Sequence, residues 1–164
     1  MRSQAVLLLL LAPGCSFFFP DMRSPADRAR ELTQRCRDFT EEAAAPLLSP
    51  VAIDSVEPAY AHVQSGPSFY QARMRGARIH MRPIATQSRE SIARSLECHQ
   101  SRVVLGTIQG AVDDPYALSG RWLDQDVDSA KDGFIVQIGS DDMSTAREVL
   151  DRAKRYAATA QPEH

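Results

Sequence analysis

The sequence lacks several features that would assign it to a protein class at once. Its net charge is only -2 over 164 residues, which excludes a histone-like or polybasic nucleic-acid binder. Its longest apolar run, residues 5–12, would form a helix about 12 Å long, too short to cross the roughly 30 Å hydrocarbon core of a bilayer. Internal repeats are not visible, and the longest low-complexity segment is the alanine run at 43–45.

The composition is otherwise that of an ordinary folded chain. Hydrophobic residues make up 43% and charged residues 24%, which argues against wholesale disorder. A chain of this length has room for one hydrophobic core, so we expect a single domain. Residues 73–102 hold seven Arg and two Glu, whereas residues 113–142 hold eight Asp. We expect these segments to form solvated faces with local ion pairing.

The N-terminal segment is typical of an export signal. Arg2 provides a positive charge, and the apolar run at 5–12 follows it. Small residues come next, with Gly14 directly before Cys15. A charged start, a short apolar stretch and small residues are the layout of a signal peptide.

Residues 1–15 resemble the signal segment of bacterial lipoproteins. In that class a lipobox, typically Leu-(Ala/Ser)-(Gly/Ala)-Cys, is cut before the cysteine, which then carries acyl chains. Gly14 and Cys15 match the motif, whereas Ala12 stands where Leu is usual and Pro13 follows it. The resemblance implies a signal peptide at 1–14, a lipidated Cys15 with a tether to residue 23, and a single domain at 24–160. A conventional cleaved signal and an uncleaved anchor are the alternatives.

The same resemblance implies a location and partners. Acyl chains contribute about 0.8 kcal/mol per buried methylene, so a lipidated Cys15 would hold the chain on a membrane. In this class the residue after the cysteine influences sorting, and Ser16 is not the Asp associated with inner-membrane retention. We therefore expect the outer membrane, with the domain facing the periplasm. The membrane and another envelope component are the expected partners, and nucleic acid is not.

The rest of the chain predicts an α+β fold. The pattern predicts a helix over residues 26–45, and residues 51–64 give a short strand plus loop. From residue 69 onward the predicted order is β-α-β-β-α, with a strand at 69–83, a helix to about 105, a hairpin at 121–140 and a last helix. We expect a helix-backed antiparallel sheet of ferredoxin-like character, with the first helix as an addition to it.

Cys36 and Cys98 are the leading candidates for a disulfide. If the chain is exported and Cys15 is acylated, the two remaining cysteines form an even set in an oxidising compartment. A bridge would dock the first helix onto the α/β unit, and the chain-entropy model values such a loop at about 4 kcal/mol. Two buried free thiols, or a reactive thiol, are the alternatives.

Other polar residues give weaker signals for metal or catalytic chemistry. Asp124, Asp126 and Asp128 superficially resemble a calcium loop, but Ser129 and Ile135 stand where an EF-hand needs Gly and Glu. Strand alternation places all three carboxylates on one solvated face, which explains them without a metal. Adjacent helical residues point about 100° apart, so the pair at 98–99 does not converge on one ion, and we expect a hydrogen-bonded core histidine at 99.

Tyr116 and Trp122 lie in the segment before the predicted hairpin. If exposed, they are candidates for an aromatic binding surface; if buried, they close the core. No residue set points to a catalytic centre or a cofactor. We therefore expect a membrane-tethered envelope lipoprotein that binds or supports another component without enzymatic activity. The alternative is an exported small-ligand or metal-binding protein that uses the Asp-rich hairpin, and an enzyme ranks third.

Overall fold

The computed structural model describes residues 23–66 and 69–160. The signal segment, Cys15 and the tether lie outside the described residues, apart from the last tether residue, Arg23. The elements in chain order are α1 (Pro25–Leu32), α2 (Glu41–Leu48), the 3-10 turn η1 (Pro50–Ala52), β1 (Ile53–Gly66), β2 (Phe69–Met81), α3 (Arg89–Val104), β3 (Asp124–Ala130), β4 (Gly133–Gly139) and α4 (Met143–Ala158). Among these described elements, no helix is long and apolar enough to cross a membrane.

The four strands form one antiparallel sheet in the order β1-β2-β4-β3. Ile79 of β2 lies opposite Val56 of β1 on one side and opposite Val136 of β4 on the other. Directly opposed residues project to the same face of a sheet. This row therefore marks the buried face, whereas the next row, which includes Arg78 and Gln137, projects to the opposite face.

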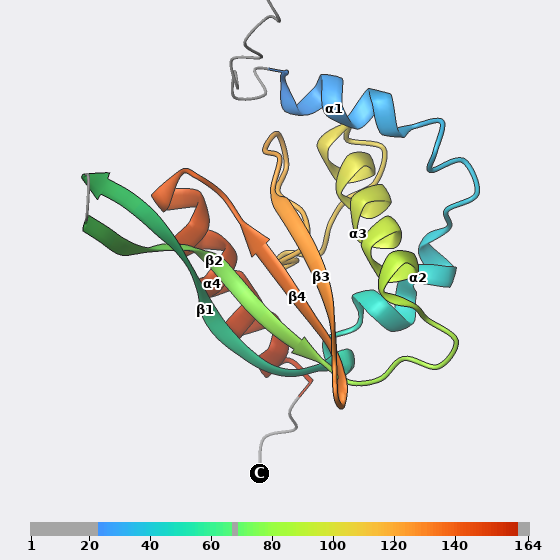
Figure 1. Cartoon of the computed structure of the whole chain (residues 1–164). Coiled ribbons are helices and arrows are strands. Elements are labelled where there is room, and N and C mark those ends of the chain that lie inside the picture. The colour runs from blue at the N-terminus through green and yellow to red at the C-terminus, as the bar shows by residue number, and fades with distance from the viewer. Residues whose placement is uncertain (1–22, 67–68, 161–164) are drawn as a thin grey trace, which may run out of the picture.

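Helices α3 and α4 pack against the sheet (Figure 1), and they supply side chains to the core on its buried face. The predicted α+β architecture, a helix-backed antiparallel sheet of ferredoxin-like character, is confirmed. Side chains from both helices and all four strands fill this core. Its largest members include Ile79, Ile92, Leu96, Tyr116, Leu123, Ile138 and Val149.

The helix boundaries follow from capping residues that the sequence displays. Ser24, Ser88 and Asp142 each accept a hydrogen bond from a backbone N–H in the first turn of the helix that follows. Hydrogen bonds from Ser144 and Thr145 lower the pKa of the Asp142 carboxyl to about 2. Each cap satisfies N–H groups that would otherwise have no partner inside the helix.

The single helix predicted for residues 26–45 is wrong. α1 ends at Leu32, residues 33–38 form turns, and Thr40 begins a second helix by accepting a hydrogen bond from the Ala43 N–H. The acidic residues Glu41 and Glu42 lie in the first turn of that helix, where the dipole favours negative charge. The chain thus had an internal helix start at Thr40 that its apolar periodicity obscured.

The short strand predicted within residues 51–64 is also corrected. β1 runs over Ile53–Gly66 and pairs with β2 along its whole length. Pro58 interrupts the pattern of hydrogen-bond donors, but β1 is an edge strand, where the missing N–H is tolerated. Opposite the register shift at Ala59 and Tyr60 lies Gly76, at φ +147°, where an added Cβ would stand 2.1 Å from the Ile138 carbonyl oxygen. A side chain at position 76 of β2 would therefore collide with the backbone of β4.

Candidate functional site

The most distinctive local structure is the attachment of α1, the turn at 33–39 and α2 to the outer side of α3. We call residues 25–48 the N-terminal cap. Cys36 of the turn and Cys98 of α3 form a disulfide with their Cα atoms 5.4 Å apart, so the predicted pairing is confirmed. The two cysteines are buried with Leu32, and Phe39 and Trp122 pack against them. This cluster is separate from the main core.

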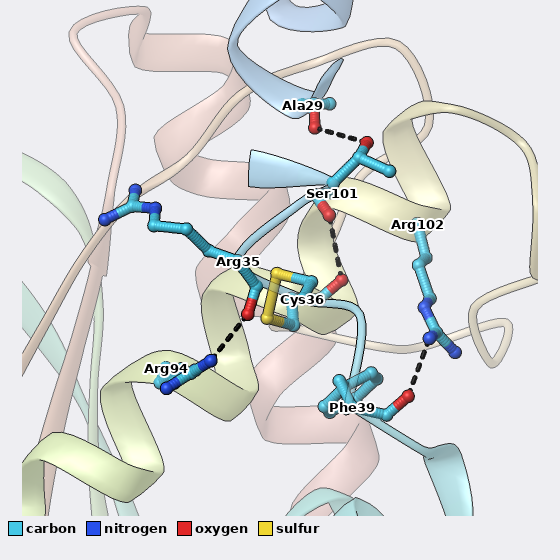
Figure 2. The surroundings of a disulfide bond; sticks show 9 residues. Ala29, Arg35, Cys36, Phe39, Arg94, Ser101 and Arg102 are labelled. Atoms are coloured by element: carbon cyan, nitrogen blue, oxygen red, sulfur yellow. Dashed lines mark hydrogen bonds between the residues drawn. A yellow bond between two sulfur atoms is a disulfide. The ribbon is translucent and has the colours of Figure 1, made fainter. Parts of the chain in front are cut away.

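Arginines of α3 hold the backbone of the turn on both sides of the disulfide (Figure 2). Arg94 donates to the Arg35 carbonyl at 2.6 Å, and Arg102 donates to the Phe39 carbonyl at 2.6 Å. The Arg102 guanidinium also lies 4.9 Å from the centroid of the Phe39 ring. Because a turn leaves carbonyl groups without helical partners, these charged donors compensate for the break between α1 and α2.

A buried histidine joins the cap to the loop that follows α3. His99 Nε2 lies 2.7 Å from Asp114 Oδ2, and His99 Nδ1 lies 3.2 Å from Glu41 Oε2. Asp114 also accepts the N–H of Tyr116 at 2.8 Å. Two ring nitrogens that both face carboxylates can both donate only when the imidazole is protonated. The geometry therefore favours an imidazolium between two carboxylates.

The electrostatics of His99 agree with this geometry. Burial by itself lowers the pKa of His99, because it penalises the charged form. The hydrogen bond that His99 donates to Asp114 and the negative charges of Asp114 and Glu41 outweigh that penalty, so the pKa of His99 is raised. The cluster is suited to binding the cap while the imidazole is protonated.

This arrangement is poorly suited to metal binding or nucleophilic catalysis. The carboxylates of Glu41 and Asp114 contact opposite nitrogens of the ring, so the three groups do not converge on one point. Cys98 precedes His99 in sequence, but its sulfur is in the disulfide. Residues 23–66 and 69–160 hold no group of three or more His, Cys, Asp or Glu that could bind a metal ion. The expectation of a hydrogen-bonded core histidine is confirmed.

The Asp-rich strand is a solvated edge of the sheet. Asp124, Asp126 and Asp128 are all exposed on β3, which lies at the end of the strand order. Asp124 pairs with Arg75 at 3.1 Å, and Asp126 accepts the N–H of the next residue. Charged residues on an edge strand discourage pairing with another chain, which accounts for these carboxylates without a ligand.

The two aromatic candidates have different outcomes. Tyr116 is 1% exposed and belongs to the main core, so its assignment to a binding surface is wrong. Trp122 is half-buried against the disulfide cluster, with the Arg28 guanidinium 5.9 Å from its ring centroid. The exposed aromatics are instead Tyr60 and Tyr70, at 60% and 65% exposure. Both project from one face of the β1–β2 hairpin, because Tyr70 lies opposite Gln64 and alternation places Gln64 on the Tyr60 side.

A pocket lies between the cap and the C-terminal half of α3. It has a volume of about 630 Å³. Arg30, Arg37 and Arg102 line it, together with polar residues such as Thr33 and apolar residues such as Leu105. Its lining brings together residues from α1, from the turn and from α3, three segments that the disulfide holds in contact. We call it the arginine pocket.

Comparison with known proteins finds no matching family model, no matching curated protein and no matching solved structure.

Proposed function

We propose that the protein is a membrane-tethered lipoprotein of the bacterial envelope, anchored through acyl chains on Cys15. The observation that supports this most directly is the Cys36–Cys98 disulfide, which leaves Cys15 as the third and unpaired cysteine. Structural disulfides persist in oxidising compartments outside the cytoplasm. A bridged pair is therefore consistent with the export signal and with a separate role for the cysteine that ends it.

We further propose that the domain binds or supports another envelope component rather than catalysing a reaction. The buried titratable cluster has both imidazole nitrogens of His99 engaged by carboxylates, so it is suited to holding elements together. The sheet face opposite the helices carries polar side chains, and the hairpin beyond it exposes Tyr60 and Tyr70 on one side. Exposed tyrosines are enriched at protein contact surfaces.

Metabolic labelling with palmitate tests the anchor. The wild-type protein is expected to incorporate the palmitate label and to fractionate with the outer membrane. Cys15→Ser is expected to lose the label completely, because the acyl chains have no other attachment point. The double variant Cys36→Ser/Cys98→Ser is the matched control. It should keep the label, because it retains Cys15 and loses only the two cysteines of the folded domain. Unlabelled wild-type protein, or label that persists in Cys15→Ser, would contradict the proposal.

A further inference from the structure

We propose that the arginine pocket binds the phosphate of an anionic phospholipid headgroup and seats the N-terminal cap on the membrane surface. This inference rests on the proposed function, because it takes the membrane to be the one in which Cys15 is anchored. It adds a ligand class and a binding site to the proposed role.

The chemistry of the pocket lining favours a phosphate. Arg30, Arg37 and Arg102 line it, and none of the described residues that line it is Asp or Glu. Guanidinium groups bind phosphate oxygens through paired hydrogen bonds and keep their charge at any physiological pH. The apolar residues of the lining, Leu105 and Ile108, suit the glycerol and upper acyl carbons of a lipid better than a fully hydrated ion.

The three arginines differ in how firmly they are held. Arg102 is half-buried and is fixed by the Phe39 carbonyl and ring. Arg37 follows the bridged Cys36 directly and forms no ion pair with another described residue. Arg30 pairs with Asp27 at 2.7 Å, but both side chains are more than half exposed, and such pairs are weak. A phosphate could therefore recruit Arg30 and Arg37 at little cost.

The position of the pocket in the molecule favours a membrane source for that phosphate. α1 and the C-terminal end of α3 lie at one end of the domain, and the C-terminal end of α4 lies at the opposite end (Figure 1). Seven residues, 16–22, separate Cys15 from Arg23. Even fully extended, such a segment spans no more than about 28 Å. The tether thus keeps the pocket end of the domain close to the bilayer that holds Cys15.

Charge complementarity points the same way. The positive charge is local to the pocket: Arg30, Arg37 and Arg102 line it without an Asp or Glu, whereas the cap as a whole carries four Arg and five acidic residues. Anionic lipids attract basic residues near the surface with about 1 kcal/mol for each Lys or Arg. The acidic strand β3 packs beside α3 but contributes no residue to the pocket.

Vesicle binding by the chain without its lipid tests the proposal independently of Cys15. Residues 16–164 suffice, because both hydrophobic clusters and the disulfide lie within residues 23–160. Partition is measured by co-sedimentation with vesicles of phosphatidylcholine alone and of phosphatidylcholine with phosphatidylglycerol. We expect clear binding to the second and little to the first. Arg30→Glu/Arg37→Glu should weaken binding at least about 25-fold, since each arginine contributes about fivefold.

The matched control is Arg78→Glu/Arg82→Glu, which makes the same charge change at exposed positions in and just after β2. It should alter binding less than threefold. Equal losses in both double variants would show attraction by net charge alone and would overturn the pocket. Equal binding to both vesicle types would overturn it as well. Inorganic phosphate that binds the chain while phosphatidylglycerol vesicles do not would show a soluble ligand and contradict the membrane source.

The outcomes of the two proposals are separable. Palmitate label on Cys15 reports the anchor whether or not the pocket binds lipid, and vesicle binding by residues 16–164 reports the pocket whether or not Cys15 is acylated. If Cys15 is labelled but the domain does not bind phosphatidylglycerol vesicles, the proposed anchor stands and the lipid-binding role of the pocket is overturned.

Discussion

The N-terminal cap and α4 both cover the rest of the domain, but they are attached by different means. α4 lays a stripe of small and branched side chains, including Ala146, Val149 and Ala153, directly on the sheet. The cap contacts α3 through one disulfide, two arginine-to-carbonyl hydrogen bonds and a buried imidazole between two carboxylates. Apolar packing resists changes of pH and redox potential, whereas the disulfide of the cap depends on redox potential and its buried imidazole depends on pH. The cap is therefore the part of the domain whose attachment responds to its surroundings.

Breaking the disulfide should give the largest difference between the two regions. Cys36→Ala/Cys98→Ala removes a bridge across 62 residues of sequence, which the chain-entropy model values at about 4 kcal/mol of unfolding free energy. Amide hydrogen exchange should accelerate in α1 and the turn more than in α4, because the buried apolar residues of that segment are Ala29, Leu32 and Cys36, and two of these belong to the disulfide cluster. Val149→Ala is the control: it creates a cavity under α4 and should cost about 2 kcal/mol without selective loosening of the cap. Uniform acceleration in the cysteine variant would remove the distinction between cap and core.

Removing the charge of Asp114 should have the next largest effect. The Asp114 and His99 side chains are 6% and 7% exposed, and breaking a buried ion pair by deleting one partner costs about 3 kcal/mol. Asp114→Asn keeps the shape of the side chain but removes the charge that holds the imidazolium. Guanidinium unfolding at pH 6 measures this loss. A change below about 0.5 kcal/mol would show that the ion pair contributes nothing net.

The same cluster predicts how stability varies with pH. The pKa of His99 is raised in the folded state, so the folded protein binds the proton more tightly than the unfolded chain does. This contribution is complete below the unfolded pKa of about 6.5 and is lost as the pH rises through the folded value. Unfolding free energy should therefore fall from pH 6 toward alkaline pH in the wild type. In His99→Gln this dependence should be absent, and an unchanged slope would contradict the assignment.

Much of the fold could be predicted because its signals are local. The capping residues Ser88 and Asp142 and the alternating strands on either side of the Lys131–Gly133 turn act over a few residues each. The disulfide could also be predicted, because counting cysteines in an exported chain leaves few possible pairings. The break between α1 and α2 was not, since residues 33–38 leave the helix to bring Cys36 to Cys98, a contact made in the tertiary structure.

The candidate sites were harder to predict for the same reason. Glu41, His99 and Asp114 come from three segments, and nothing in their spacing predicts that they meet. The arginine pocket likewise combines α1, the turn and α3. Tyr116 was placed with Trp122 because the two are close in sequence, yet one lies in the main core and the other against the disulfide. Tyr60 and Tyr70 share a face only through the register of a hairpin whose first strand the sequence underestimates.

The fate of the three cysteines tests the account most directly. Protein extracted from membranes is denatured without reductant, treated with an alkylating reagent and mapped by mass spectrometry. We expect an N-terminal peptide that begins at an acylated Cys15, a linked peptide that joins Cys36 to Cys98, and no alkylated cysteine. An alkylated Cys36 or Cys98 would contradict the bridge. A Cys15 that reacts with the alkylating reagent, or a mature chain from which Cys15 has been removed with the signal, would contradict the anchor.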